Sequence, residues 1–314
     1  MAKVSVAMCT YNGAEYLREQ IESIFAQTVV PDEIIVTDDR STDATAAILE
    51  EYAKTTTLRY VINDIQLGFV KNFENAISLC SGEYIVLADQ DDVWLPEKIE
   101  MLLNKIEDNL LVYSDAELVD SKLIPLGKRL LNPAKTKTIE GNGNNKAFVF
   151  GNCVSGNTIL FRKELADLAL PIPADIPFHD AYLAFCASTC GAIQYVDKAL
   201  VLYRQHGNNI TDSAGLKKKK KRSKIEGKRE SNRKRIAILR AFLKCSCLNV
   251  DDRNLLEKLL QGYEKYESTF FNFLLFRVLY QNQDEFFAID VKKSFMRIVK
   301  VALGLNAYKI FPFL

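Results

Sequence analysis

The sequence has no apolar run that approaches the ~18 residues needed for a membrane-spanning helix. Near the N-terminus, the apolar residues 4–9 are too few for the core of a secretory signal peptide, and polar residues follow them. We therefore expect neither a membrane span nor a signal peptide.

Cysteine is present, but its spacing indicates neither a disulfide framework nor a zinc site. The seven cysteines include no pair separated by two residues and no set with zinc-ligand spacing. Cys9 and Cys80 lie in apolar segments, so we expect them to be buried thiols. This usage favours a reducing, cytoplasmic compartment.

Net charge is also nearly absent, at +1. The balance hides an asymmetry, because residues 217–235 hold twelve Lys or Arg residues against Glu226 and Glu230. The chain of 314 residues is 48% hydrophobic. It can form one large domain with a real core, or one domain plus an extension.

Strand and helix patterns alternate through roughly the first 115 residues. Strand-like segments occur at residues 4–9, 33–37, 58–62, 84–88 and 110–113, and helical patterns lie between them, as at 44–53 and 69–80. The alternation predicts an α/β fold with a mostly parallel, doubly wound sheet.

A strongly acidic stretch follows the strand at residues 84–88. Asp89, Asp91 and Asp92 precede a helix that Pro96 is suited to begin. Carboxylates confined in a cleft repel one another, and a divalent cation with a preference for oxygen ligands relieves that repulsion. The alternative is a surface loop in which Asp92 caps the next helix.

Polar residues also follow two earlier strands. Thr10, Tyr11 and Asn12 come after the first strand, and Asp38 and Asp39 come after the second. Ligands bind at the carboxyl ends of strands in open α/β sheets. We therefore expect these loops and the acidic stretch to line one edge of the sheet.

The composition changes after the last strand pattern at residues 199–204. We assign residues 1–212 to an α/β domain, 213–235 to a basic linker and 236–314 to a helical, aromatic C-terminal extension. The basic run can contact anionic lipid headgroups or be a solvated linker. No nucleic-acid recognition module accompanies it, so we expect no nucleic-acid partner.

Five blocks, in this order, resemble glycosyltransferase family 2. Residues 9–13 look like the family's opening, and residues 36–43 resemble the next block, with Arg40 where the family often has glycine. Residues 89–94 resemble the DxD block, and 179–180 the later acidic site. Residues 203–209 are similar to the end block of the bacterial rhamnosyltransferase-like branch, so the resemblance covers residues 3 to about 212.

The resemblance implies a GT-A fold, Rossmann-like with a mostly parallel central sheet, and transfer of a sugar from a UDP- or dTDP-linked donor with inversion at the anomeric carbon. It implies that Thr10, Tyr11 and Asn12 line the nucleoside site. It also implies that Asp38 or Asp39 hydrogen-bonds the N–H of the base.

By the same resemblance, Asp91 contacts a Mn²⁺ or Mg²⁺ ion that bridges the diphosphate, and His206 is an additional ligand. Asp89 would touch the ribose or the surroundings of the metal, and Asp180 would be the catalytic base. Mixed ligation by a carboxylate and an imidazole suits Mn²⁺ better than Mg²⁺.

These roles have structural alternatives. Asp180 can be the N-cap of the following helix, and His206 can be an exposed loop residue. His179 either orients Asp180 or packs locally. Trp94 either stacks on an acceptor sugar or packs behind the acidic loop.

We expect a non-processive enzyme, because no Gln-x-x-Arg-Trp block and no channel helices occur. The resemblance suggests rhamnose as the sugar, and a surface polysaccharide or lipid-linked oligosaccharide as the acceptor. The enzyme would then be cytoplasmic, or peripheral at the inner face of the cell membrane.

Two other functions stay open at this point. A nucleotidyltransferase has a similar sheet and acidic site, but it needs a glycine-rich first loop with Lys or Arg, which residues 10–13 lack. A catalytically dead sugar-nucleotide-binding scaffold is the non-enzymatic alternative, and the intact pair Asp91 and Asp180 argues against it.

Overall fold

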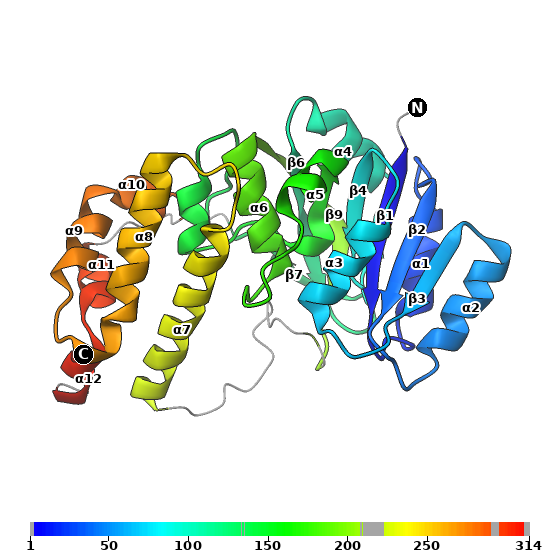
Figure 1. The fold of residues 1–314 in the computed structure, drawn as a ribbon. Coiled ribbons are helices and arrows are strands. Elements are labelled where there is room, and N and C mark those ends of the chain that lie inside the picture. The colour runs from blue at the N-terminus through cyan, green and yellow to red at the C-terminus, as the bar shows by residue number, and fades with distance from the viewer. Residues whose placement is uncertain are drawn as a thin grey trace.

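A nine-stranded sheet with helices on both faces occupies the chain up to Arg204, and a block of helices follows beside it (Figure 1). The computed structural model describes residues 3–132, 134, 136–207, 209, 223–289 and 295–310.

The strands are β1 (Val4–Thr10), β2 (Glu33–Asp38), β3 (Leu58–Ile62), β4 (Tyr84–Ala88), β5 (Val93–Trp94), β6 (Leu111–Val119), β7 (Pro125–Arg129), β8 (Ile159–Arg162) and β9 (Ile193–Arg204). The helices of the sheet region are α1 (Leu17–Phe25), α2 (Thr45–Thr55), α3 (Phe69–Leu79), α4 (Lys98–Ile106), η1 (Asn145–Val149), η2 (Gly156–Thr158), α5 (Lys163–Ala169) and α6 (His179–Cys190). The later helices are α7 (Lys224–Phe242), α8 (Val250–Glu264), η3 (Tyr266–Ser268), α9 (Phe273–Gln281), α10 (Gln283–Phe286), α11 (Phe295–Ala302) and α12 (Leu305–Ile310).

The strand order is β3-β2-β1-β4-β8-β6-β9-β5, with β7 paired to β6. The strands β3, β2, β1 and β4 are parallel, and β6 is parallel to β9. The antiparallel strand β8 joins the two groups, and β5 is antiparallel to β9. The predicted mostly parallel sheet is confirmed, and the alternation of elements had indicated β1 to β4 and the start of β6.

Each face of the sheet has its own core. Successive side chains of a strand point to opposite faces. Accordingly, Val6 and Met8 of β1 pack with α1, α2 and α4, whereas Ala7 and Cys9 belong to a core with α3, α6 and the C-terminal helices. The doubly wound arrangement follows from this alternation.

Two predicted boundaries differ from the structure. The helix expected to begin at Pro96 begins at Lys98, because β5 first pairs with β9. The strand at residues 110–113 continues through Asp115 to Val119 as β6, because β9 pairs along its whole length.

The C-terminal helices pack directly on the sheet region. The ring of Phe185 in α6 stacks on that of Phe242 in α7 at a centroid distance of 3.8 Å. Of the predicted basic linker, residues 224–235 form the first part of α7, behind a capping box at Ser223. Residues 213–222 lie outside the described residues, and the domain boundaries stay a prediction.

Cys9 and Cys80 are buried free thiols, as expected. Cys190 and Cys247 form a disulfide, which the spacing of the cysteines had not indicated, so the reducing compartment stays a prediction. In the described part of the chain, no helix is long and apolar enough to span a membrane.

Candidate active site

Hydrogen bonds join the loops that follow β1, β2 and β4. The side chain of Gln90 accepts from the backbone N–H of Tyr11 at 2.8 Å and donates to its carbonyl at 3.1 Å. The side-chain oxygen of Asn12 accepts from the backbone N–H of Thr42 at 2.8 Å. The polar loops therefore meet at one edge of the sheet, as the sequence predicted.

A pocket of about 360 Å³ opens between these loops and the start of α6. Among the candidate residues, it is lined by Thr10, Tyr11, Asp39, Asp89, Asp91 and Asp180. Asn12 and Asp38 do not line it. His206 does not line the pocket, but its ring lies within hydrogen-bond distance of the lining residue Asp91. Most of the predicted residues thus share one hollow, although their roles stay predictions.

The two neighbouring carboxylates after β2 differ in their surroundings. Asp38 is buried and accepts hydrogen bonds from the hydroxyl of Thr10 at 2.7 Å and from the backbone N–H of Ser41 at 2.8 Å. Asp39 faces the pocket, and its Oδ2 accepts a hydrogen bond from the backbone N–H of Gly68 at 2.9 Å. A carboxylate oxygen has two lone pairs. Because Asp39 lines the pocket and Asp38 does not, Asp39 is the one that can accept a bond from a ligand.

The DxD carboxylates are under mutual repulsion. Burial, together with the negative charges of Asp91 and Asp180, raises the pKa of Asp89 to about 7. Because a nearby cation favours the ionised form, a bound divalent ion would relieve this arrangement.

Asp91 and His206 fit a metal ion as neighbouring ligands. Oδ2 of Asp91 lies 2.8 Å from Nε2 of His206. Two ligand atoms at ~2.1 Å from one ion, at a right angle, are about 3 Å apart. Within the described residues, the acidic site brings no three such groups close enough to hold an ion alone. Ligands from a bound phosphate would complete the shell, as is usual for Mg²⁺.

Asp180 lies in the first turn of α6, with its carboxylate in the pocket. Its oxygens accept hydrogen bonds from the side chain of Asn152 at 3.2 Å and from the backbone N–H of Gly156 at 3.1 Å. Burial raises its pKa to about 6, against the lowering effect of these hydrogen bonds. The N-cap residue of α6 is Phe178 and has no side-chain cap bond, so Asp180 is not the N-cap.

Residues 5–167 match the sequence model of Glycosyl transferase family 2, which is just over half of the chain. The chain belongs to this family. The predicted family and the enzyme class, a glycosyltransferase, are thereby confirmed.

Curated relatives agree with this assignment. An uncharacterized glycosyltransferase of Haemophilus influenzae is 30% identical over 222 residues, covering 66% of this chain and 67% of the relative. The dTDP-rhamnosyl transferase RfbG of Shigella flexneri is 34% identical over 222 residues, covering 64% and 72%. The chain spans about two thirds of the length of the first curated relatives it matches.

A solved structure supports the fold. The crystal structure of S. aureus TarS 1-349 in complex with UDP-GlcNAc has a TM-score of 0.58 to this chain, at 19% identity, covering 90% of this chain and 78% of that one. At this identity the likeness concerns the fold alone. The expected GT-A architecture with a helical C-terminal part is confirmed.

Several residues that support the acidic loop were not singled out by the motifs. Arg204, at the end of β9, donates from its backbone N–H to the carboxylate of Asp92 at 3.0 Å. Asn157 donates to the same carboxylate at 2.6 Å, and its carbonyl accepts from the ammonium of Lys98 at 2.8 Å. The buried carboxylate of Asp92 therefore ties the acidic loop to β9 and to Asn157, and it does not cap a helix. The available sequence signal was the position of Arg204 inside the end block.

Both aromatic alternatives are resolved by packing. His179 makes no hydrogen bond to Asp180; its ring stacks on Phe73 at 4.1 Å, and both ring nitrogens are buried without a partner. Burial lowers the pKa of His179 to about 3, so the ring is neutral. Trp94 is buried behind the acidic loop, with the ammonium of Lys98 3.4 Å from its ring centroid, and cannot stack on an acceptor sugar.

Gly13 gives a test of the loop junction. A Cβ at this position would lie 2.2 Å from Oε1 of Gln90. Gly13→Ala must therefore displace the Gln90 side chain, which links the loops that follow β1 and β4. We expect nucleotide binding to be about tenfold weaker by titration calorimetry, because the net free energy of one hydrogen bond corresponds to about that factor. Gly227→Ala in α7, where a Cβ meets nothing within 4 Å, is the matched control and should bind normally.

Proposed function

We propose that the protein is an inverting, metal-dependent, non-processive glycosyltransferase. Its donor is a sugar linked to UDP or dTDP, with rhamnose as the first candidate. Its acceptor is a hydroxyl group of a surface polysaccharide or a lipid-linked oligosaccharide. The observation that carries the proposal is the shared pocket of Asp39, Asp91 and Asp180 at the carboxyl ends of the strands.

Two kinds of observation support the donor class. The structural neighbour TarS was solved with UDP and with UDP-GlcNAc, and the relative RfbG is named a dTDP-rhamnosyl transferase. In this chain, Tyr11 and Asp39 line the part of the pocket next to β1 and β2. There Asp39 can accept the N–H that uracil and thymine share, so this site suits either base.

Asp180 supplies the proton acceptor. Its carboxylate is held by Asn152 and the backbone of Gly156, and its raised pKa of about 6 keeps it largely ionised at neutral pH while making it more basic than an exposed Asp. A base with a pKa near the working pH is an effective proton acceptor. Asp180 can take the proton of the acceptor hydroxyl. The oxygen of that hydroxyl then bonds to the donor sugar, and the nucleoside diphosphate leaves.

Asp91 and His206 would hold the divalent ion. When bound, such an ion offsets the negative charge that develops on the diphosphate leaving group. The contribution of the chain is to keep the carboxylate and the imidazole together at the pocket wall. Mn²⁺ is the ion that this ligand pair favours, with Mg²⁺ as the alternative.

A donor panel tests the proposal. The protein is incubated with Mn²⁺ and dTDP-rhamnose, UDP-glucose or UDP-GlcNAc, and the products are separated by chromatography. We expect nucleoside diphosphate from one donor, lost with EDTA and restored by Mn²⁺. Release of pyrophosphate from a nucleoside triphosphate and a sugar phosphate would instead indicate a nucleotidyltransferase. Binding of nucleotide sugar without turnover, with every acceptor tried, would indicate a scaffold.

The proposed location is the inner face of the cell membrane, where a lipid-linked acceptor is found. Support comes from the basic residues 217–235, because cations near an anionic surface contribute about 1 kcal/mol each. The first part of this run, residues 217–222, lies outside the described residues.

A further inference from the structure

A second cavity lies among the C-terminal helices, away from the active-site pocket. It has a volume of about 430 Å³ and is formed by α7, α8, η3 and α11 together with Phe150. Four cationic side chains line it, namely Lys228, Arg235, Arg297 and Lys300, and no Asp or Glu of the described residues does. The wall charge therefore fits an anion.

Arg235 lies in the cavity wall and has no acidic partner among the described residues. Its guanidinium lies 4.5 Å from the ring centroid of Phe150, and burial lowers its pKa, with the positive charge of Arg297 acting in the same direction. Among the described residues, no ion pair involves Arg235, Lys228 or Lys300.

Two acids of the surrounding helices pair with arginines outside the cavity wall. Glu267 pairs with Arg229, and Glu264 pairs with Arg240. A half-buried cation without a counter-ion is costly, so binding an anion in the cavity is favourable.

A buried amide provides a second, independent sign of a ligand. Asn232 lines the cavity and is only 6% exposed, yet its side-chain oxygen has no hydrogen-bond partner. Buried amide oxygens are almost always paired. A ligand that carries a hydroxyl group beside its phosphate would satisfy the amide oxygen and the cations together.

Exposed apolar side chains lie next to the cavity on the same helix. In α11, Met296 lines the cavity and is 55% exposed, and the preceding Phe295 is 54% exposed. The ring of Phe295 packs edge-on against those of Phe276 and Tyr280 in α9. Basic and aromatic groups side by side are typical of helices that lie at a membrane interface.

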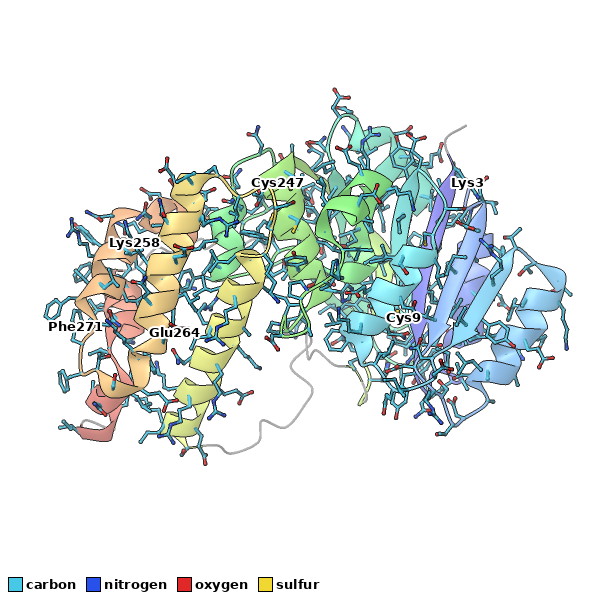
Figure 2. All side chains as sticks on the ribbon, in the orientation of Figure 1. Lys3, Cys9, Cys247, Lys258, Glu264 and Phe271 are labelled. Atoms are coloured by element: carbon cyan, nitrogen blue, oxygen red, sulfur yellow. A yellow bond between two sulfur atoms is a disulfide. The ribbon has the colours of Figure 1, made fainter. Side chains whose placement is uncertain are left out.

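This aromatic surface continues to the outer edge of the C-terminal helices. Phe271 lies at that edge, far from Cys9 at the active-site end of β1 (Figure 2). Phe273, whose ring packs against that of Phe271, is 77% exposed. A soluble phosphate would use the cavity but gives no role to this surface, whereas a lipid uses both.

We propose that the cavity binds the phosphate and hydroxyl groups of an anionic phospholipid headgroup, and that Phe273, Phe295 and Met296 enter the interfacial layer of the membrane. The helix α7 begins on the side of the molecule to which the carboxyl ends of β1 to β4 point (Figure 1). The first turns of α7, which include the cavity residue Lys228, therefore lie on the same side of the molecule as the active-site edge.

Vesicle flotation of the full chain tests the proposal, with phosphatidylcholine vesicles that either contain or lack phosphatidylglycerol. We expect flotation only with phosphatidylglycerol. The double variant Lys228→Gln and Lys300→Gln should bind about 30-fold more weakly, since each cation near an anionic surface contributes about a factor of five. Lys258→Gln with Lys265→Gln removes the same charge from exposed positions and should bind normally.

Further arms separate the sources of phosphate. Phe273→Ser should weaken flotation but leave the affinity for inorganic phosphate, measured by calorimetry, unchanged. Phosphate binding without flotation would show a soluble ligand and overturn the lipid proposal, as would equal losses in both double variants. Release of nucleoside diphosphate in solution should be the same in all variants, so failure here is distinguishable from failure of the proposed function.

Discussion

Replacing Asp180 by asparagine is expected to lower the rate of sugar transfer by about 10²–10⁴-fold, the usual contribution of a general base. Asparagine has nearly the same shape and keeps an oxygen for the N–H of Gly156, but it cannot take a proton from the acceptor. Binding of the nucleoside diphosphate should therefore be retained. Single-turnover transfer and calorimetric nucleotide binding measure the two properties separately.

The matched control is Asp167→Asn, which changes an exposed carboxylate on the neighbouring helix α5 and should leave transfer unchanged. If Asp180→Asn transfers sugar at the normal rate, the base is a different group. If it loses nucleotide binding as well as transfer, Asp180 serves donor binding instead.

The pH dependence of transfer follows from the same carboxylate. Because burial raises the pKa of Asp180 to about 6, the fraction of ionised base, and with it kcat/KM, should rise tenfold per pH unit below about 6 and level off above it. The residual activity of Asp180→Asn should lack this dependence.

Stability should show the opposite sign. The pKa of Asp180 is higher in the folded chain than in the unfolded one, so its contribution is fully present below about pH 4 and is lost as the pH rises through about 6. At neutral pH, Asp180→Asn should therefore be at least as stable as the original chain in denaturant titrations.

The sequence predicted the active-site edge well because one rule covers it. Parallel strands end at the same edge of a sheet, so polar residues after β1, β2 and β4 had to meet. The antiparallel strand β8 had no comparable signal, since periodicity reports which face a residue takes and not the direction of its neighbour.

The choice between Asp38 and Asp39 could not be made in advance. The register of β1 and β2 pairs Asp38 with Thr10, and Asp38 accepts a hydrogen bond from the Thr10 hydroxyl. Asp39 then faces the pocket. A shift by one residue would exchange their roles, and the register is not written in either segment alone. The basic cavity was hidden for a similar reason, because α7 and α11 contribute its cations from distant parts of the sequence.

Arg204→Met is expected to lower the free energy of unfolding by about 3 kcal/mol, because it removes the hydrogen bonds that a buried cation donates to two carbonyls and a carboxylate. The side chain is 1% exposed. Its guanidinium donates to the carbonyl of Asp91 at 2.8 Å and to that of Ser121 at 2.7 Å, pairs with Glu19, and lies 4.4 Å from the ring centroid of Tyr16. Methionine fills a similar volume but makes none of these bonds, so urea unfolding measures the loss.

Arg204→Met should also weaken nucleotide binding, because Arg204 donates to the backbone carbonyl of Asp91, whose carboxylate lies beside His206. Arg204→Lys should recover only part of the stability, since one ammonium cannot replace a planar guanidinium that reaches three acceptors in different directions. Arg18→Met removes an exposed arginine whose ion pair with Glu51 lies on the surface, and should change neither property. A loss in Arg204→Met no larger than in Arg18→Met would mean that the acidic loop holds its shape without Arg204, and that the carboxylate of Asp91 is positioned by β4 and Gln90 alone.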